Sequence, residues 1–134
     1  MPPSTTSRKK RILIVDDRQD HSGAVGQLLN EDFELVGRLS DGASALHETA
    51  RLEPDVVLLD ISLEDMDGVE VARQLIAQNS EAKIIFLSVH ERPSLVGLAA
   101  ELGASGYVYK SRAAAELRRA IARVCIGDKY FPLV

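Results

Sequence analysis

Five side chains with useful chemistry each follow a short apolar run in this sequence: Asp16, Asp17, Asp60, Ser88 and Lys110. The runs are residues 12–15, 56–59, 83–87 and 107–109. A single aspartate in such a place usually serves a turn or caps a helix. Several runs that end in this way indicate a site only if the fold brings their ends together.

The residue types predict metal-dependent phosphoryl chemistry. Three carboxylates held close together repel one another, which raises the pKa of at least one unless a divalent cation neutralises them. Oxygen ligands without histidine or cysteine favour Mg²⁺ or Mn²⁺ over zinc. A lysine and a hydroxyl supply the charge and the hydrogen bond that phosphoryl oxygens need, with one aspartate as the nucleophile.

The apolar runs are typical of strands buried on both faces, because they are short, rich in β-branched residues and leucine, and bounded by polar turns. A further, imperfectly alternating segment at 33–39 predicts an edge strand. Helical spacing follows each strand, at about 20–30, 43–52, 68–78, 93–102 and 112–126. Five strands alternating with five helices predict a three-layer α/β sandwich around a parallel sheet. Right-handed crossovers then place all the strand carboxyl ends at one edge, where such sheets bind ligands.

Local signals predict how several helices begin and which faces they bury. Asp41 is expected to cap the second helix, and Asp67 with Glu70 forms a capping-box pattern before the third. In the fourth helix Leu95, Leu98, Ala99 and Leu102 recur at intervals of three and four. Ser111 is expected to cap the last helix, and its inward positions are Leu117, Ile121 and Val124.

Composition bounds the class of protein. The 134 residues suit one domain, and 46% hydrophobic with 27% charged residues is typical of a soluble globular chain. Cys125 is the only cysteine, which excludes an intrachain disulfide and a cysteine metal cluster; we expect it to be a small buried side chain. Only four apolar residues follow the basic run 8–11, so we expect neither a signal peptide nor a membrane span, and a cytoplasmic location.

Charge argues against nucleic acid as a ligand of this domain. Without the four positive charges of residues 8–11, the net charge of −4 becomes −8 for residues 12–134. A domain with this negative net charge does not attract the phosphate backbone of DNA. The basic run itself is better interpreted as a solvated start to the first strand than as a binding site.

The five-point pattern, with Asp60 in Leu-Leu-Asp-Ile and Lys110 in Gly-Tyr-Val-Tyr-Lys-Ser, resembles the receiver domain of two-component response regulators. This resemblance covers about residues 10–128, preceded by a disordered basic arm at 1–9 and followed by a C-terminal tail or the start of a linker at 129–134. It implies a flavodoxin-like (βα)5 sandwich with the sheet order 2-1-3-4-5.

The resemblance also implies a role for each site residue. Asp60 would be the phosphoacceptor, and Mg²⁺ would be bound directly by Asp17, Asp60 and the backbone carbonyl of Ser62, with help from Asp16. Ser88 would be the switch hydroxyl, Lys110 the lysine that pairs with the phosphoryl group, and Tyr107 the rotating aromatic residue. Ser62 and His90 would tune dephosphorylation. The remaining histidines, His21 and His47, are expected to be surface residues.

The segments 103–111 and 127–132 look most like regulators whose output is a LuxR/NarL-type helix-turn-helix, which these 134 residues do not contain. The implied partner is a sensor histidine kinase, with a possible homodimer on phosphorylation, and the implied output is transcription. The domain would catalyse only its own phosphorylation and dephosphorylation, so it is not expected to be an enzyme in the usual sense.

Two other classes of protein do not fit the sequence, and one alternative stays open. A haloacid-dehalogenase-like phosphatase needs a second aspartate two residues after the nucleophile, where Ser62 stands. A Rossmann domain needs a Gly-x-Gly-x-x-Gly motif after the first strand, where residues 16–19 read Asp-Asp-Arg-Gln. The third alternative, a stand-alone or phosphorylation-independent receiver acting as an interaction module, stays open.

Overall fold

The computed structural model describes residues 8–78 and 80–132, so positions 1–7 of the predicted basic arm lie outside the described residues. The elements follow in the order β1 (Arg11–Val15), α1 (Gln19–Leu29), β2 (Glu34–Leu39), α2 (Gly42–Leu52), β3 (Val56–Leu59), α3 (Gly68–Ala77), β4 (Lys83–Ser88), α4 (Pro93–Leu102), β5 (Gly106–Tyr109), a short 3₁₀ helix (Lys110–Arg112) and α5 (Ala113–Cys125). The predicted alternation of strands and helices is confirmed. No helix in this part of the chain is both long and apolar enough to cross a bilayer.

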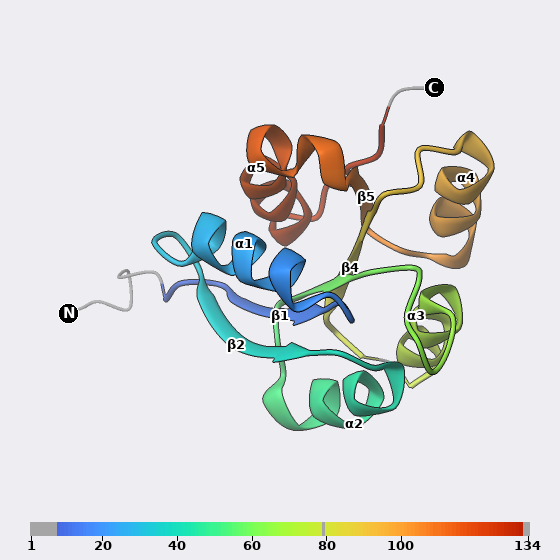
Figure 1. Ribbon diagram of the computed structural model, residues 1–134, viewed down its shortest axis with the longest axis horizontal. Coiled ribbons are helices and arrows are strands. Elements are labelled where there is room, and N and C mark those ends of the chain that lie inside the picture. The colour runs from blue at the N-terminus through green and yellow to red at the C-terminus, as the bar shows by residue number, and fades with distance from the viewer. Residues whose placement is uncertain (1–7, 79, 133–134) are drawn as a thin grey trace.

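The five strands form one sheet in the order β2-β1-β3-β4-β5, and every neighbouring pair is parallel. The predicted flavodoxin-like order is therefore confirmed. Helices α1 and α5 cover one face of the sheet, and α2, α3 and α4 cover the other (Figure 1). In the central pairs Val15 lies beside Leu59, and Leu59 beside Phe86, so the strands end nearly level. The residues that follow them consequently meet at one edge.

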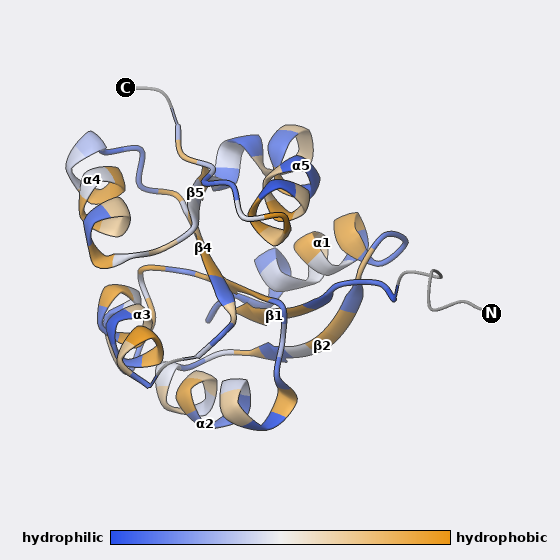
Figure 2. Ribbon diagram, turned by 180° about the vertical axis from the view of Figure 1, so that it is seen from behind, coloured by the Kyte–Doolittle hydropathy of each residue, from blue (hydrophilic) through white to orange (hydrophobic). Residues whose placement is uncertain are grey.

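Alternation along the strands divides the core into two layers. Ile12 and Ile14 pack with α1 and α5, whereas Leu13 and Val15 pack with α2, α3 and α4. The strands at the centre of the sandwich are accordingly largely apolar, with basic residues only at the start of β1 and β4 (Figure 2). Each such side chain contributes about 1.5–3 kcal/mol when fully buried. The sheet is thus a rigid frame for the residues at its edge.

Helix α2 receives two carboxylates at its start. Asp41 accepts a hydrogen bond from Ser44 N at 2.7 Å, as the sequence predicted. Asp65, from the loop after β3, accepts hydrogen bonds from the amides of Gly42 and Ala43 at 2.8 and 3.0 Å. These amides hold the pKa of Asp65 below its ordinary value. The loop that follows Asp60 is therefore tied to the neighbouring helix.

Helix α3 begins at the predicted residue but not with the predicted capping box. Asp67 accepts from Val69 N at 2.8 Å. Glu70, however, does not reach back to Asp67, because its two oxygens accept hydrogen bonds from Arg73 and Gln74 one turn further along. That half of the capping-box prediction is wrong.

Two predictions about other helices differ from the structure, the first at one position only. In α4 three of the four periodic positions face the core, since Ala99 is buried and Leu95 and Leu102 are partly buried against it; Leu98, however, is exposed, and Val96 is buried. The 3₁₀ turn of residues 110–112 precedes α5, so Ser111 does not cap it; its hydroxyl instead donates to Glu91 at 2.8 Å. The inward positions predicted for α5 are confirmed, since Leu117, Ile121 and Val124 are fully buried.

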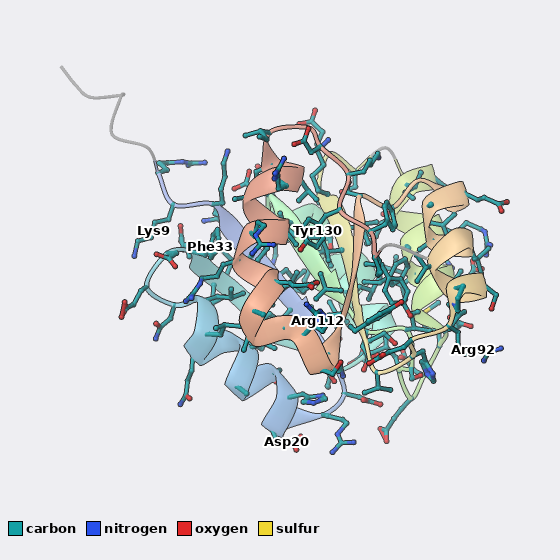
Figure 3. The ribbon with its side chains drawn as sticks, turned by 90° about the horizontal axis from the view of Figure 1, so that it is seen from above. Lys9, Asp20, Phe33, Arg92, Arg112 and Tyr130 are labelled. Atoms are coloured by element: carbon teal, nitrogen blue, oxygen red, sulfur yellow. The ribbon has the colours of Figure 1, made fainter. Side chains whose placement is uncertain are left out.

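The segment after α5 returns to the edge of the sheet. Cys125, expected to be buried, is the last residue of α5 and is partly exposed. Tyr130 then pairs with β5: its amide donates to Ser105 O at 3.0 Å, and its carbonyl accepts from Tyr107 N at 2.9 Å. Figure 3 labels Tyr130 beside α5. A Cβ atom on Gly106 would lie 2.8 Å from Tyr130 O, so glycine permits this close approach.

Candidate phosphoacceptor site

The three aspartates predicted to share a site do so. Asp16 and Asp17 follow β1 and Asp60 follows β3, and one carboxylate oxygen from each lies within 4.8 Å of the others. Asp16 and Asp60 are almost fully buried, whereas Asp17 is partly exposed. Hard oxygen donors at this separation are the ligands that Mg²⁺ and Mn²⁺ prefer. The donor set therefore fits such an ion.

Lys110 reaches into this cluster from the end of β5. Its Nζ donates to Asp16 Oδ2 at 2.9 Å and to Asp60 Oδ2 at 3.0 Å, and its side chain is only 8% exposed. The other oxygens of the two carboxylates accept backbone amides, Asp16 Oδ1 from Arg18 at 2.9 Å and Asp60 Oδ1 from Ser62 at 3.1 Å. One cation therefore bridges two buried carboxylates.

The charge of Asp60 is only partly compensated. Burial raises the pKa of its carboxyl above the ordinary value of 3.8, and the Lys110 ammonium opposes this rise. A buried carboxylate whose pKa is raised is less stable as an anion than it is in water. Additional positive charge at this position, such as a divalent cation, would therefore be favourable.

Ser88 and Tyr107 both bind the backbone of the loop between β4 and α4. The Ser88 hydroxyl accepts from His90 N at 3.0 Å, and the Tyr107 hydroxyl donates to His90 O at 2.7 Å. The Tyr107 ring is fully buried, and this burial raises the pKa of its hydroxyl. The ring packs near Phe86 and edge-on to Tyr109, with centroids 6.1 and 5.8 Å away. The aromatic side chain expected to rotate is thus already inside the domain.

The two predicted tuning residues are in contact with each other. Ser62 Oγ and His90 Nε2 are 3.1 Å apart, so a hydrogen bond joins the loop after Asp60 to the loop after Ser88. A second link joins that latter loop to the end of β5, since Ser111 donates to Glu91. Contacts of this kind depend on where separate loops meet, and nothing local in the sequence indicates them.

The sequence patterns do not predict two further residues at the site. Gly68 lies against the backbone of Asp60: its amide donates to Ile61 O at 2.7 Å, and a Cβ atom would lie 2.1 Å from Asp60 O. His21, predicted to be a surface residue, is indeed 34% exposed, but its Nδ1 is buried and lies 3.9 Å from Asp16 Oδ2. The Asp-Gly sequence at 67–68 is a signal for Gly68. Nothing in the sequence indicates that His21 lies near Asp16.

The fold and the site define the class of flavodoxin-like α/β domains with an acidic cluster and a lysine at the carboxyl edge of the sheet. Residues 12–122 match the response regulator receiver domain, and the chain belongs to this family. The predicted family is therefore confirmed.

Relatives point to the predicted LuxR/NarL subgroup. The chain is 34% identical over 132 residues to the transcriptional regulatory protein DegU of Brevibacillus brevis, covering 97% of this chain and 56% of that protein. It is 33% identical over 120 residues to the transcriptional regulatory protein LiaR of Bacillus subtilis, covering 88% and 57%. A two-component response regulator of the LuxR family from Aurantimonas sp. SI85-9A1 superimposes with a TM-score of 0.87 at 29% identity, covering 92% and 89%. The chain thus spans a little over half the length of the two curated relatives.

Proposed function

We propose that the domain accepts a phosphoryl group on Asp60 from a histidine kinase or a small phosphodonor. The observation that supports this most is the bridge of Lys110 between Asp60 and Asp16, beside a third carboxylate. A carboxylate oxygen of Asp60 attacks the donor's phosphorus, and the bond from phosphorus to the donor's nitrogen or oxygen breaks. The donor leaves with the electron pair of that bond.

The remaining site residues assist this transfer. A Mg²⁺ or Mn²⁺ ion held by Asp16, Asp17, Asp60 and the carbonyl of Ser62 would neutralise the cluster and the incoming oxygens. Lys110 pairs with one phosphoryl oxygen, and the Ser88 hydroxyl donates to another. The product is an acyl phosphate on the domain itself, so the domain catalyses only its own modification.

The modified domain would act through a protein partner. Its similarity to transcriptional regulators supports a role in controlling transcription through a LuxR/NarL-type helix-turn-helix that lies outside these 134 residues. We place this role in the cytoplasm, with a sensor histidine kinase upstream and with self-association on phosphorylation. The negative body of the domain supports binding to proteins rather than to DNA or membranes.

Labelling with acetyl phosphate tests the chemistry. Intact-mass spectrometry should show one added phosphoryl group on the wild-type chain in Mg²⁺, and none in EDTA. Asp60→Asn should remain unlabelled in Mg²⁺. Equal labelling of Asp60→Asn, or undiminished labelling in EDTA, would contradict the assignment.

One observation favours the alternative of a phosphorylation-independent interaction module. Tyr107 is buried and hydrogen-bonded to His90 O without any phosphoryl group. In that alternative, beryllofluoride with Mg²⁺ would leave the oligomeric state unchanged. Under our proposal, sedimentation velocity should detect a larger species when beryllofluoride and Mg²⁺ are added to the wild type, and Ser88→Ala should weaken this response.

A further inference from the structure

His21 lies beside the site, close to Asp16. It lies in the first turn of α1, next to Asp20, which Figure 3 labels at the start of this helix. Its Nδ1 is buried and has no hydrogen-bond partner within the described part of the chain. An unpaired buried polar atom is unfavourable, so such an atom needs an explanation. The nearest acidic group is Asp16 Oδ2, at 3.9 Å.

That oxygen of Asp16 is held by Lys110 alone in this conformation. Lys110 Nζ donates to Asp16 Oδ2 at 2.9 Å and shares its remaining hydrogens with Asp60 Oδ2 at 3.0 Å. Asp16 Oδ1 is held separately by the amide of Arg18. If Lys110 turns toward a phosphoryl group on Asp60, Asp16 Oδ2 loses this hydrogen bond. A carboxylate offers about four lone-pair sites, so Asp16 can help to hold a divalent cation and still accept from a second donor.

We propose that His21 is a positioning residue that takes over Asp16 Oδ2 when Lys110 turns to the phosphoryl group. Its Nδ1–H would close from 3.9 Å to the 2.7–2.9 Å of a charge-assisted hydrogen bond, a shift of about 1 Å that rotation of one side chain can supply. A neutral imidazole with its proton on Nδ1 is a sufficient donor. His21 would thereby keep Asp16 oriented, which favours the phosphorylated state over the free one.

This inference rests on the proposed function, because only a phosphoryl group on Asp60 gives Lys110 a reason to leave. It also predicts which histidine atom matters. Asparagine at position 21 can place an amide N–H near the position of Nδ1, whereas glutamine places its amide near Nε2. The pair His21→Asn and His21→Gln therefore separates the proposed contact from a general need for a polar side chain.

Beryllofluoride binding, followed by ¹⁹F NMR with Mg²⁺ at constant concentration, tests the proposal. His21→Ala and His21→Gln should bind beryllofluoride about tenfold more weakly than the wild type, because a hydrogen bond to a charged group is lost. His21→Asn should restore most of the affinity. His47→Ala is the matched control, since His47 lies exposed on α2, and its affinity should equal that of the wild type.

A spectroscopic measurement of the protonated nitrogen of His21 tests the proposal independently of binding affinity. In ¹⁵N-labelled protein, long-range proton–nitrogen spectra should show His21 with its proton on Nδ1 once beryllofluoride is bound. Equal affinities for the Ala, Asn and Gln variants, or a bound state protonated only on Nε2, would overturn the role of His21 and leave the phosphoacceptor assignment standing. Failure of the wild type itself to bind beryllofluoride would overturn both.

Discussion

Replacing Gly68 by alanine tests whether the start of α3 is what positions Asp60. The added Cβ would lie 2.1 Å from Asp60 O and 2.7 Å from Ile61 Cα, both of them backbone atoms that cannot swing away. Relieving this overlap requires the loop and helix to separate, and overpacking of this kind costs about 1–3 kcal/mol. The hydrogen bond from Gly68 N to Ile61 O, 2.7 Å long, would weaken as well, at about 1 kcal/mol. Together these effects predict a loss of roughly 2–4 kcal/mol in the free energy of unfolding.

Urea denaturation with Gly97→Ala as the control gives a clear reading. Gly97 lies inside α4, and a Cβ there would meet no atom within 4 Å. Alanine should stabilise that helix by up to about 1 kcal/mol. Helix propensity alone predicts the same gain in stability for Gly68→Ala, whereas the close approach predicts a loss. The two explanations therefore predict opposite changes in the free energy of unfolding. A Gly68→Ala variant with an unfolding free energy within 0.5 kcal/mol or so of the wild type would refute the close-approach argument. A displaced Asp60 should also slow labelling by acetyl phosphate.

Three other variants probe the charge of Asp60, the Ser62–His90 hydrogen bond and the packing of the C-terminal segment. Burial raises the pKa of Asp60 above 3.8, so the folded domain holds the carboxyl proton more tightly than the unfolded chain does. The free energy of unfolding therefore falls as the pH rises between the unfolded and folded pKa values. Asp60→Asn should unfold at a higher urea concentration than the metal-free wild type at pH 7, and this difference should disappear toward pH 3.8. His90→Ala or Ser62→Ala should shorten the lifetime of the acyl phosphate about fivefold. The double variant should shorten it no further, because both single changes remove the same hydrogen bond. Additive effects of the two changes would contradict this prediction. Gly106→Ala should free residues 128–132, which amide hydrogen exchange at Tyr107 would report as lost protection.

The parts of the fold that the sequence predicts are those governed by local patterns. Buried strands, the cap at Asp41 and the inward stripe Leu117, Ile121 and Val124 all follow from spacing within a few residues. The convergence of Asp16, Asp17, Asp60 and Lys110 follows from one topological rule applied to strand ends. Local periodicity and the right-handed crossover rule together therefore predict where the candidate site lies.

The parts that it does not predict depend on contacts between separate segments. Ser111 resembles a cap in sequence, but Glu91 on another loop takes its hydroxyl. In α4 Leu95, Ala99 and Leu102 face the core as their spacing suggests, yet Leu98 is exposed and Val96 is buried, because packing against the sheet sets the rotation of the helix. The approach of His21 to Asp16 is of the same kind. A pattern within one segment does not specify which side chains of a second segment will contact it.

The position of Tyr107 constrains how a phosphoryl group on Asp60 could change the surface. Inward rotation of the ring is not available from this conformation, because the ring is already buried. Ser88 can donate to a phosphoryl oxygen and still accept from His90 N, since a hydroxyl donates once and accepts twice. A ligand shifts an equilibrium only through its different affinity for the two states. The change must therefore come from a group that cannot serve both states, and Lys110, shared between two carboxylates, is such a group.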